Sequence, residues 1–244
     1  MLHIVPRLAQ HVERIGKEVV VEQPLHVGVG GAQQGLKTGA GVLEQLDGVG
    51  ITVFQQGAKA FHQCAGLHVC GFRRILHVMP DQLSQTTTFR RNLAKIGARG
   101  WAFDICVLAR QLPIAKDLAL ACPDQPLVLD HCGVPDVAGG AFDDWARGID
   151  AMAALPNVHL KLSGITAYCA PGTANEATLQ PWVDHAINAF GADRVLWGSD
   201  WPVVNLGVGM PDWITLTRTL LARRTEGEQS DIVQGTARRV YRLG

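Results

Sequence analysis

The sequence predicts an α/β fold of the (β/α)8-barrel type, with five βα units recognisable between residues 71 and 244. Two observations carry this prediction. Short apolar runs alternate with amphipathic helical stretches, which is typical of a parallel sheet. The runs begin 28, 25, 32 and 36 residues apart, and an eight-fold barrel of about 250 residues uses roughly 31 per unit. Because 70 residues are too few for three more units, we expect an incomplete barrel in which strands four to eight are recognisable.

The five predicted strands are apolar runs that end in polar residues. They are Arg73–Met79, Trp101–Val107, Pro126–His131, Val158–Ser163 and Arg194–Ser199. Parallel strands of this kind are covered by helices. Within the fourth run, we interpret His159 and Lys161 as pointing toward the helix layer or solvent.

The helices between the strands have readable ends. Asp143 or Asp144 is expected to cap one helix, because a short acidic side chain can accept a hydrogen bond from the first-turn amides. Thr178 is expected to begin another, with Pro181 in its first turn and Gly191 at its end.

Two further helices are predicted near the end of the sequence. One follows Asp212 and runs over 213–224. Ser230 is expected to cap the last. The inward face of that last helix is predicted to carry Ile232, Val233, Ala237, Val240 and Tyr241.

Residues 1–70 differ in composition from the rest of the chain. They hold 11 of the 27 glycines, no Trp and no Tyr, and a single aspartate, Asp47. Hydrophobic periodicity is weak there, and helix start and stop signals are unconvincing. We interpret 1–70 as an atypical glycine-rich segment and 71–244 as the C-terminal part of the barrel.

Composition and charge exclude several classes of function. Lys plus Arg and Asp plus Glu each number 22, so there is no basic excess of the kind that nucleic acids or acidic membranes attract. The sequence contains no apolar run of 18 residues and no apolar leader at its start. Its six cysteines lack C-x-x-C pairing, which favours reduced thiols. We therefore expect a cytoplasmic protein that acts on a small molecule, with neither nucleic acid nor membrane as partner.

Polar side chains gather at the predicted carboxyl ends of the strands. His131, Ser163 and Asp200 follow the third, fourth and fifth strands. Arg73 and Asp104 lie on the first two. The carboxyl ends of parallel strands meet at one rim, where α/β folds place their chemistry, so these side chains are expected to lie together.

This set of side chains is suited to hydrolysis. A carboxylate beside an imidazole can act as a general base toward water, or the two can bind a divalent ion that activates the water. A guanidinium can pair with a substrate carboxylate. Each residue also has a structural interpretation: His131 as a core residue, Asp200 as a turn cap, Arg73 as an ion pair. Their joint occurrence at successive strand ends favours the functional one.

Six segments appear in the order typical of one family. They are GFRRILHV (71–78), GWAFDICVLARQLP (100–113), QPLVLDHCGVPD (125–136), LPNVHLKLSGITAY (155–168), FGADRVLWGSDWPV (190–203) and ARRVYRL (237–243). Together they resemble the amidohydrolase, or metal-dependent hydrolase, superfamily. The most similar branch, amidohydrolase 2, includes sugar-lactone and pyrone-dicarboxylate lactonases.

The resemblance implies opening of a lactone or similar cyclic ester of a small carboxylated or sugar-acid substrate by water. Asp200 is expected to activate that water, and His131 to contact metal or substrate. His131 and Asp200 are also the candidate metal ligands. Asp104 stands where many metal-binding relatives carry a histidine, which favours one divalent ion, such as zinc, or none. The residues expected to bind substrate are Arg73, His77, Asp104, Ser163 and Trp201.

The sequence departs from the family in one respect. The family opens with an H-x-H motif on its first strand, and none of the nine histidines forms one. Two alternatives therefore stand beside the lactonase hypothesis: a zinc-dependent decarboxylase of the same branch, and a catalytically inactive truncated barrel. The identity of the substrate and the oligomeric state stay open.

Overall fold

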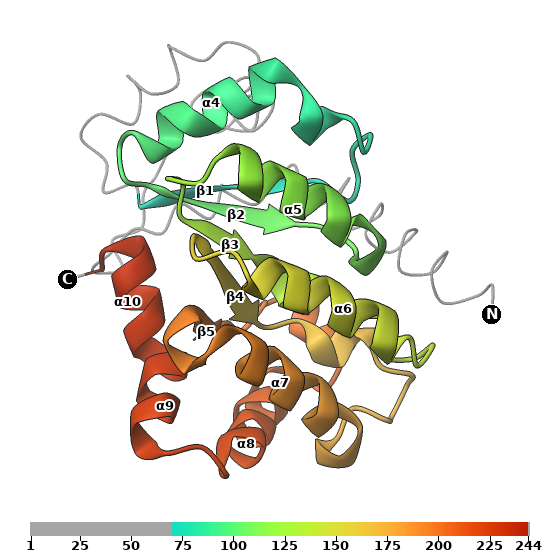
Figure 1. The fold of residues 1–244 in the computed structure, drawn as a ribbon. Helices are drawn as coiled ribbons and strands as arrows, with labels where there is room; N and C mark the ends of the chain where they lie inside the picture. Colours follow the sequence, from blue (N-terminus) through green and yellow to red (C-terminus); the bar gives the residue numbers. More distant parts are fainter. Residues whose placement is uncertain (1–69, 244) are drawn as a thin grey trace, which may run out of the picture. The chain divides into compact units, whose positions relative to one another are not determined.

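Five parallel strands form one sheet in the order of the sequence (Figure 1) within residues 70–243, which are the residues described in a computed structural model of the chain. They are β1 (Gly71–Ile75), β2 (Ala102–Cys106), β3 (Leu127–Leu129), β4 (Val158–Leu162) and β5 (Val195–Trp197). All five predicted strands are present, and each is shorter than its apolar run. Strand β1 begins at Gly71, two residues before its predicted start at Arg73. The expectations for the glycine-rich segment concern residues 1–69, which lie outside the described residues, and Cys70.

Helices follow each strand. The longer ones are α4 (Thr87–Gly97), α5 (Leu112–Ala121), α6 (Phe142–Ala153), α7 (Glu176–Phe190), α8 (Met210–Leu221), α9 (Glu226–Ser230) and α10 (Thr236–Tyr241). Short helical turns are η1 (Leu83–Gln85), η2 (Ala109–Gln111), η3 (Asp130–Gly133), η4 (Ile165–Tyr168), η5 (Ala192–Arg194), η6 (Val203–Leu206) and the π-helical η7 (Asp231–Gly235). Among the helices of residues 70–243, none combines the length and hydrophobicity that a bilayer crossing requires.

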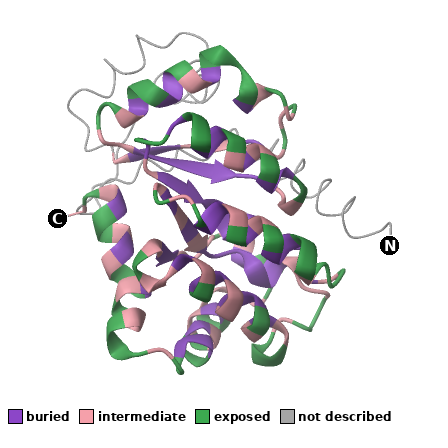
Figure 2. Cartoon of the chain, viewed as in Figure 1, coloured by how far each residue is buried: buried purple, intermediate pink, exposed green. Residues whose placement is uncertain are grey.

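The outer face of the sheet packs against the helices. Alternate residues of a strand point to opposite faces, and on this face Phe103 of β2 meets Phe89 of α4 edge to face, with ring centroids 6.0 Å apart. At the other end of the sheet, Trp197 of β5 stacks on Trp213 of α8. Buried residues accordingly run along the strands and line the sides of the helices that face them (Figure 2). Consecutive parallel strands whose outer face is covered by helices confirm the predicted barrel-type arrangement.

The inner face of the sheet has two zones. At the amino ends of the strands, Ala102, Val128 and Leu196 form an apolar cluster with Val240 of α10. One step further along β2, β3 and β4 come charged residues, described below. The expectation that Lys161 points to the helix layer or solvent is wrong, and His159 shares its face by strand alternation. Both belong to the inner face, where carboxylates compensate the Lys161 charge.

Several helix ends differ from those predicted. Helix α7 begins at Glu176 because the side chain of Asn175 accepts a hydrogen bond from the Thr178 amide, so Pro181 lies inside the helix rather than in its first turn. Asp143 and Asp144 do not cap α6. They lie in its first turn, where acidic charge suits the positive end of the helix dipole.

Gly191 ends α7 with φ 79°, as predicted. The last helical run, however, starts earlier than Ser230. Thr225 caps it in a reciprocal capping box with Glu228. Val233 was expected to face inward but is 53% exposed, because the wider π-helical turn of η7 interrupts the 3.6-residue period on which that expectation rested.

Candidate functional site

Three polar side chains meet at the carboxyl ends of β3, β4 and β5. The Nδ1 atom of His131 lies 2.8 Å from Ser163 Oγ and 3.5 Å from Asp200 Oδ2. His131 and Ser163 are buried, and the Asp200 side chain is 11% exposed. The structure thus brings together the three residues that the sequence placed at successive strand ends.

The same three residue types make up a serine-hydrolase triad, but the geometry here is different. In a triad the serine and the carboxylate contact opposite nitrogens of the histidine, so that a proton can be relayed between them. Here Ser163 and Asp200 both face Nδ1 of His131. Ser163 is therefore placed to orient the imidazole rather than to act as a nucleophile, and Asp200 stands as a separate acid–base group.

The backbone around these residues is unusual. His131 and Cys132 have φ 54°, Val134 has φ 48° and Asp200 has φ 54°. Left-handed conformations cost L-residues other than glycine roughly 1–2 kcal/mol each, and such strain clusters at functional sites. Opposite them, Gly164 is required, because a Cβ atom there would lie 2.6 Å from Asp200 Oδ2.

Burial sets the protonation of the rim residues. It raises the pKa of Asp200 to about 7, with the nearby Asp130 adding to the rise while Arg73 and Lys161 oppose it. Burial, followed by the positive charge of Arg73, holds the pKa of His131 well below its usual value. His131 is therefore neutral near pH 7, and Asp200 gains or loses its proton in that range, as a general base must.

A group of five residues, here termed the inner charge cluster, lies below this rim: Arg73, Asp104, Asp130, Lys161 and Tyr241. Lys161 Nζ lies 2.5 Å from Asp104 Oδ2 and 2.8 Å from Asp130 Oδ1. Arg73 Nε lies 2.8 Å from Asp130 Oδ2, and Nη2 lies 3.3 Å from Asp104. The Tyr241 hydroxyl donates to Asp104 Oδ1 at 2.7 Å. Two cations therefore balance two carboxylates.

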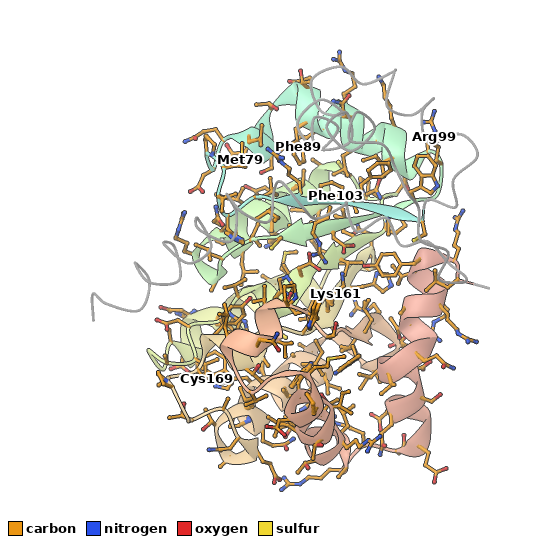
Figure 3. The ribbon with its side chains drawn as sticks, turned by 180° about the vertical axis from the view of Figure 1, so that it is seen from behind. Met79, Phe89, Arg99, Phe103, Lys161 and Cys169 are labelled. Carbon is orange, nitrogen blue, oxygen red and sulfur yellow. The ribbon has the colours of Figure 1, made fainter. Side chains whose placement is uncertain are left out.

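Electrostatics keep these cations charged. Burial alone would lower the pKa of Lys161, but the adjacent Asp130 and Asp104 outweigh it and raise that pKa above its usual value. The same balance, with the same two aspartates, raises the pKa of Arg73. Lys161 lies near the middle of the structure (Figure 3), with its side chain 12% exposed.

Four residues of this region were not predicted as site residues: Asp130, Lys161, Tyr168 and Tyr241. Strand alternation carried a signal for Lys161, since it stands two residues before Ser163 and so shares its face. Asp130 directly precedes His131 at the end of β3. No local pattern marks Tyr241, which lies 137 residues from Asp104. Tyr168, whose pKa is raised by burial and then by Asp200, lies in an apolar turn.

The other predicted substrate residues are divided between the interior and the surface. His77 Nδ1 lies 3.5 Å from the Sγ atom of Cys106, and Trp201 is 58% exposed beyond β5. Arg73 and Asp104 belong to the inner charge cluster, so a substrate carboxylate would share the Arg73 guanidinium with Asp130.

Three buried side chains offer donors for a metal ion. The candidate ligand atoms of Cys106, Asp130 and His131 all lie within 4.8 Å of one another. Thiolate, carboxylate and imidazole are the three ligand types that zinc takes in proteins, so the donor set fits such an ion. Of the two ligands expected from the sequence, His131 belongs to this group and Asp200 does not.

A model of the family described as Amidohydrolase matches residues 36–243. The match thus begins within the glycine-rich segment, ahead of residue 71. An L-fucono-1,5-lactonase from Burkholderia multivorans is 32% identical over 200 residues, which are 77% of this chain and 68% of that protein. A 2-pyrone-4,6-dicarboxylate hydrolase from Comamonas testosteroni is 34% identical over 158 residues, covering 60% of this chain and 51% of that one.

Solved structures of amidohydrolases are also similar to this chain. A crystal structure of an amidohydrolase from Burkholderia multivorans with bound HEPES has a TM-score of 0.73 and 30% identity, covering 78% of this chain and 70% of that one. A second, with bound zinc, has a TM-score of 0.69 and 32% identity, covering 72% and 65%. A 2,6-dihydroxybenzoate decarboxylase is 15% identical with a TM-score of 0.52, covering 79% and 68%. That last likeness concerns the fold alone.

Proposed function

The chain belongs to the amidohydrolase family, and on this premise we propose that it opens a lactone of a small sugar acid or carboxylated compound by attack of water. One observation carries the proposal. Asp200, at the end of β5, is a nearly buried carboxyl group whose pKa is raised to about 7 by burial. Such a group can take a proton from water near neutral pH. The names of the two lactone-hydrolysing relatives, quoted above, point to the same chemistry.

The proposed reaction proceeds in two steps. Ionised Asp200 accepts a proton as the water oxygen attacks the lactone carbonyl carbon. The bond between that carbon and the ring oxygen then breaks, and the ring oxygen takes up a proton, which Asp200 can return. One water is consumed, and the products are a carboxylic acid and an alcohol within one open chain.

The surrounding residues would position the substrate. Ser163 orients the neutral His131 ring, which can hydrogen-bond to the substrate. Arg73 and Lys161 are close enough to Asp200 to oppose the rise in its pKa. We propose that their positive charge also favours the negative charge that develops on the carbonyl oxygen, since preorganised charge lowers the barrier. Trp201, exposed beyond β5, is proposed to contact the substrate at the rim.

A divalent ion is compatible with this site. Zinc, when bound, would polarise the carbonyl or activate the water, and Cys106, Asp130 and His131 are the residues that fit it. The zinc-bound relative supports this proposal for the present chain.

The test compares the full chain with Asp200→Asn on L-fucono-1,5-lactone and 2-pyrone-4,6-dicarboxylate, following acid release with a pH indicator. Because the variant cannot accept the proton, we expect kcat to fall by about 10²–10⁴-fold with an unchanged circular dichroism spectrum. Asp212→Asn, an exposed acid in the first turn of α8, is the matched control and should keep full activity. Undiminished turnover by Asp200→Asn would contradict the assignment.

The same assay separates the alternatives. Carbon dioxide release from a carboxylated aromatic, without acid release from a lactone, would identify a decarboxylase. A folded wild-type chain that turns over neither class would identify an inactive barrel. The lactonase proposal predicts acid release alone.

A further inference from the structure

We propose that the hydroxyl of Tyr168 donates a hydrogen bond to the carbonyl oxygen of the lactone during hydrolysis, as a further catalytic residue beside Asp200. This inference rests on the proposed function, because it concerns the carbonyl group that the water attacks. It goes further by naming a residue to which the mechanism given above assigns no role. Tyr168 is the last residue of η4, the short turn that follows β4.

The surroundings of Gly164 show where the Tyr168 hydroxyl lies. A Cβ atom on Gly164 would lie 2.6 Å from Asp200 Oδ2, 3.1 Å from the Tyr168 hydroxyl oxygen and 3.2 Å from His131 Cβ. These three side chains therefore converge on the bare backbone of Gly164. The carboxylate of the proposed base and the phenol hydroxyl lie close enough together for one bound molecule to contact both.

The Tyr168 hydroxyl is available as a donor. Within residues 70–243 it forms no hydrogen bond, whereas the hydroxyl of Tyr241 donates to Asp104. Burial, and then the charge of Asp200, hold the pKa of Tyr168 well above its usual value. The hydroxyl therefore keeps its proton at the neutral pH at which Asp200 can act.

The backbone around Tyr168 fixes the position of its side chain. The Tyr168 carbonyl accepts a hydrogen bond from the Ala138 amide at 3.0 Å. Turn η4 also packs against η6, the turn that follows Asp200. That contact is close, because a Cβ atom on Gly207 at the end of η6 would lie 2.5 Å from Thr166 Oγ1. The proposed donor and the proposed base are thus held by two turns that pack directly together.

The proposed reaction needs a donor at this place. In a reactive arrangement the water oxygen lies about 3–3.5 Å from the carbonyl carbon, so a hydroxyl beside Asp200 can reach the carbonyl oxygen. As the water attacks, that oxygen gains negative charge, and a hydrogen bond to it becomes stronger. Tyrosine is one of the side chains that stabilise such charge. Tyr168 keeps its proton in this step, so the proton balance given above is unchanged.

The activity test compares Tyr168→Phe with the full wild-type chain on L-fucono-1,5-lactone. Phenylalanine keeps the ring and removes only the hydroxyl. We expect kcat to fall by about 10²–10³-fold, as on removal of one oxyanion donor, while KM and Tm change little. Cys169→Ala is the matched control, since it removes a thiol of the same turn that contacts the Ile165 carbonyl, and it should keep its kcat. An active wild type whose Tyr168→Phe variant keeps its kcat would overturn this inference and leave the proposed function standing.

A binding measurement does not depend on turnover. The probe is the 1,5-lactam analogue of L-fucono-1,5-lactone, labelled with ¹³C at the carbonyl, and infrared spectroscopy records the carbonyl stretching frequency of the bound probe. A hydrogen bond from Tyr168 lowers this frequency, so we expect a lower value in wild type than in Tyr168→Phe. Equal frequencies would refute the inference even if kcat falls, because the hydroxyl would then act through Asp200. An inactive wild type that shows the frequency difference refutes the proposed activity alone.

A second measurement covers the case in which Tyr168→Phe does not fold. Replacing both tyrosines of the chain by 3-fluorotyrosine keeps their shape and makes their hydroxyls stronger donors. The carbonyl frequency of the bound lactam should then fall further. A frequency that does not move, or a lactam that the folded wild type does not bind, would count against Tyr168 as the donor.

Discussion

Replacing Lys161 by methionine should expose how strongly the inner charge cluster depends on charge balance. Methionine keeps most of the side-chain volume and removes the ammonium. The carboxylates of Asp104 and Asp130 would then face Arg73 as their only cation within the cluster. Both are nearly buried, with side chains 10% and 0% exposed, so water cannot replace the lost charge.

The magnitude follows from the distances. At an effective dielectric constant of about 20, ion pairs at 2.8 Å and 2.5 Å each attract by about 6 kcal/mol. Desolvation of Lys161 in the native protein offsets several kcal/mol of that gross attraction. Breaking a buried pair by removing one partner typically costs about 3–5 kcal/mol, because a charge remains uncompensated. We expect a loss in that range for Lys161→Met.

Urea unfolding followed by tryptophan fluorescence measures the effect. With a slope of about 2 kcal/mol per molar urea, the midpoint should fall by about 2 M. The matched control is the double variant Lys161→Met with Asp104→Asn, which removes one charge of each sign and should recover most of the loss. A single variant that loses less than about 1 kcal/mol, or a double variant no more stable than the single one, would refute the charge-balance argument.

Four further predictions concern the rim and the base of the site. The folded protein holds the Asp200 proton up to about pH 7, while the unfolded chain releases it near pH 3.8. The free energy of unfolding should therefore fall by up to about 4 kcal/mol as pH rises from about 4 to 7. Asp200→Asn should remove most of this pH dependence in urea titrations. For the same reason, hydrolysis should increase as pH rises through about 7, and a flat pH–rate profile would contradict the role of Asp200. Tyr241→Phe leaves Asp104 Oδ1 without its donor and should cost about 1–3 kcal/mol, read as a lower Tm, whereas an unchanged Tm would show that the bond is not structural. Trp201→Ala, at a 58% exposed position, should raise KM while unfolding free energy stays within about 0.5 kcal/mol; an unchanged KM would remove Trp201 from the substrate contacts.

The strand pattern was predictable because burial on the helix-facing side is a local property. Strands β2 to β5 fall within apolar runs of the sequence, and β1 overlaps its predicted run but begins two residues earlier, at Gly71. Their order follows from the spacing of the runs. His131, Ser163 and Asp200 could be placed together for the same reason, since each directly follows a strand. The strand ends were less predictable, because the strand hydrogen bonds stop before the last apolar residue when the chain turns at the rim.

The inner charge cluster was not predictable as a whole. Lys161 resembles an exposed residue when read alone, and only its ion pairs with two distant aspartates explain why it is buried. Tyr241 was expected to face inward, but its hydroxyl partner lies 137 residues away, beyond the reach of any local pattern. Two helix starts were predicted wrongly for a smaller reason. Asn175 caps α7 instead of Thr178, and Thr225 caps α9 instead of Ser230. Which of several nearby polar residues caps a helix depends on hydrogen-bond geometry that the sequence does not reveal.

The apolar zone where α10 covers the inner face has a consequence for the order of folding. Contacts between each strand and its own helix span short stretches of chain, whereas the inner cluster joins residues 31, 57 and 137 positions apart. Long-range contacts require loop closure before they contribute energy. We therefore expect the outer face of the sheet to pack against its helices and exclude water first, while the inner charge cluster is still hydrated. Pulsed hydrogen exchange should then protect the amides of α4 to α7 before those of α10, and the reverse order would contradict this expectation. In this order of folding, water stays at the inner charge cluster until α10 packs against the sheet. The charged side chains then lose their hydration only when their ion-pair partners are already in place.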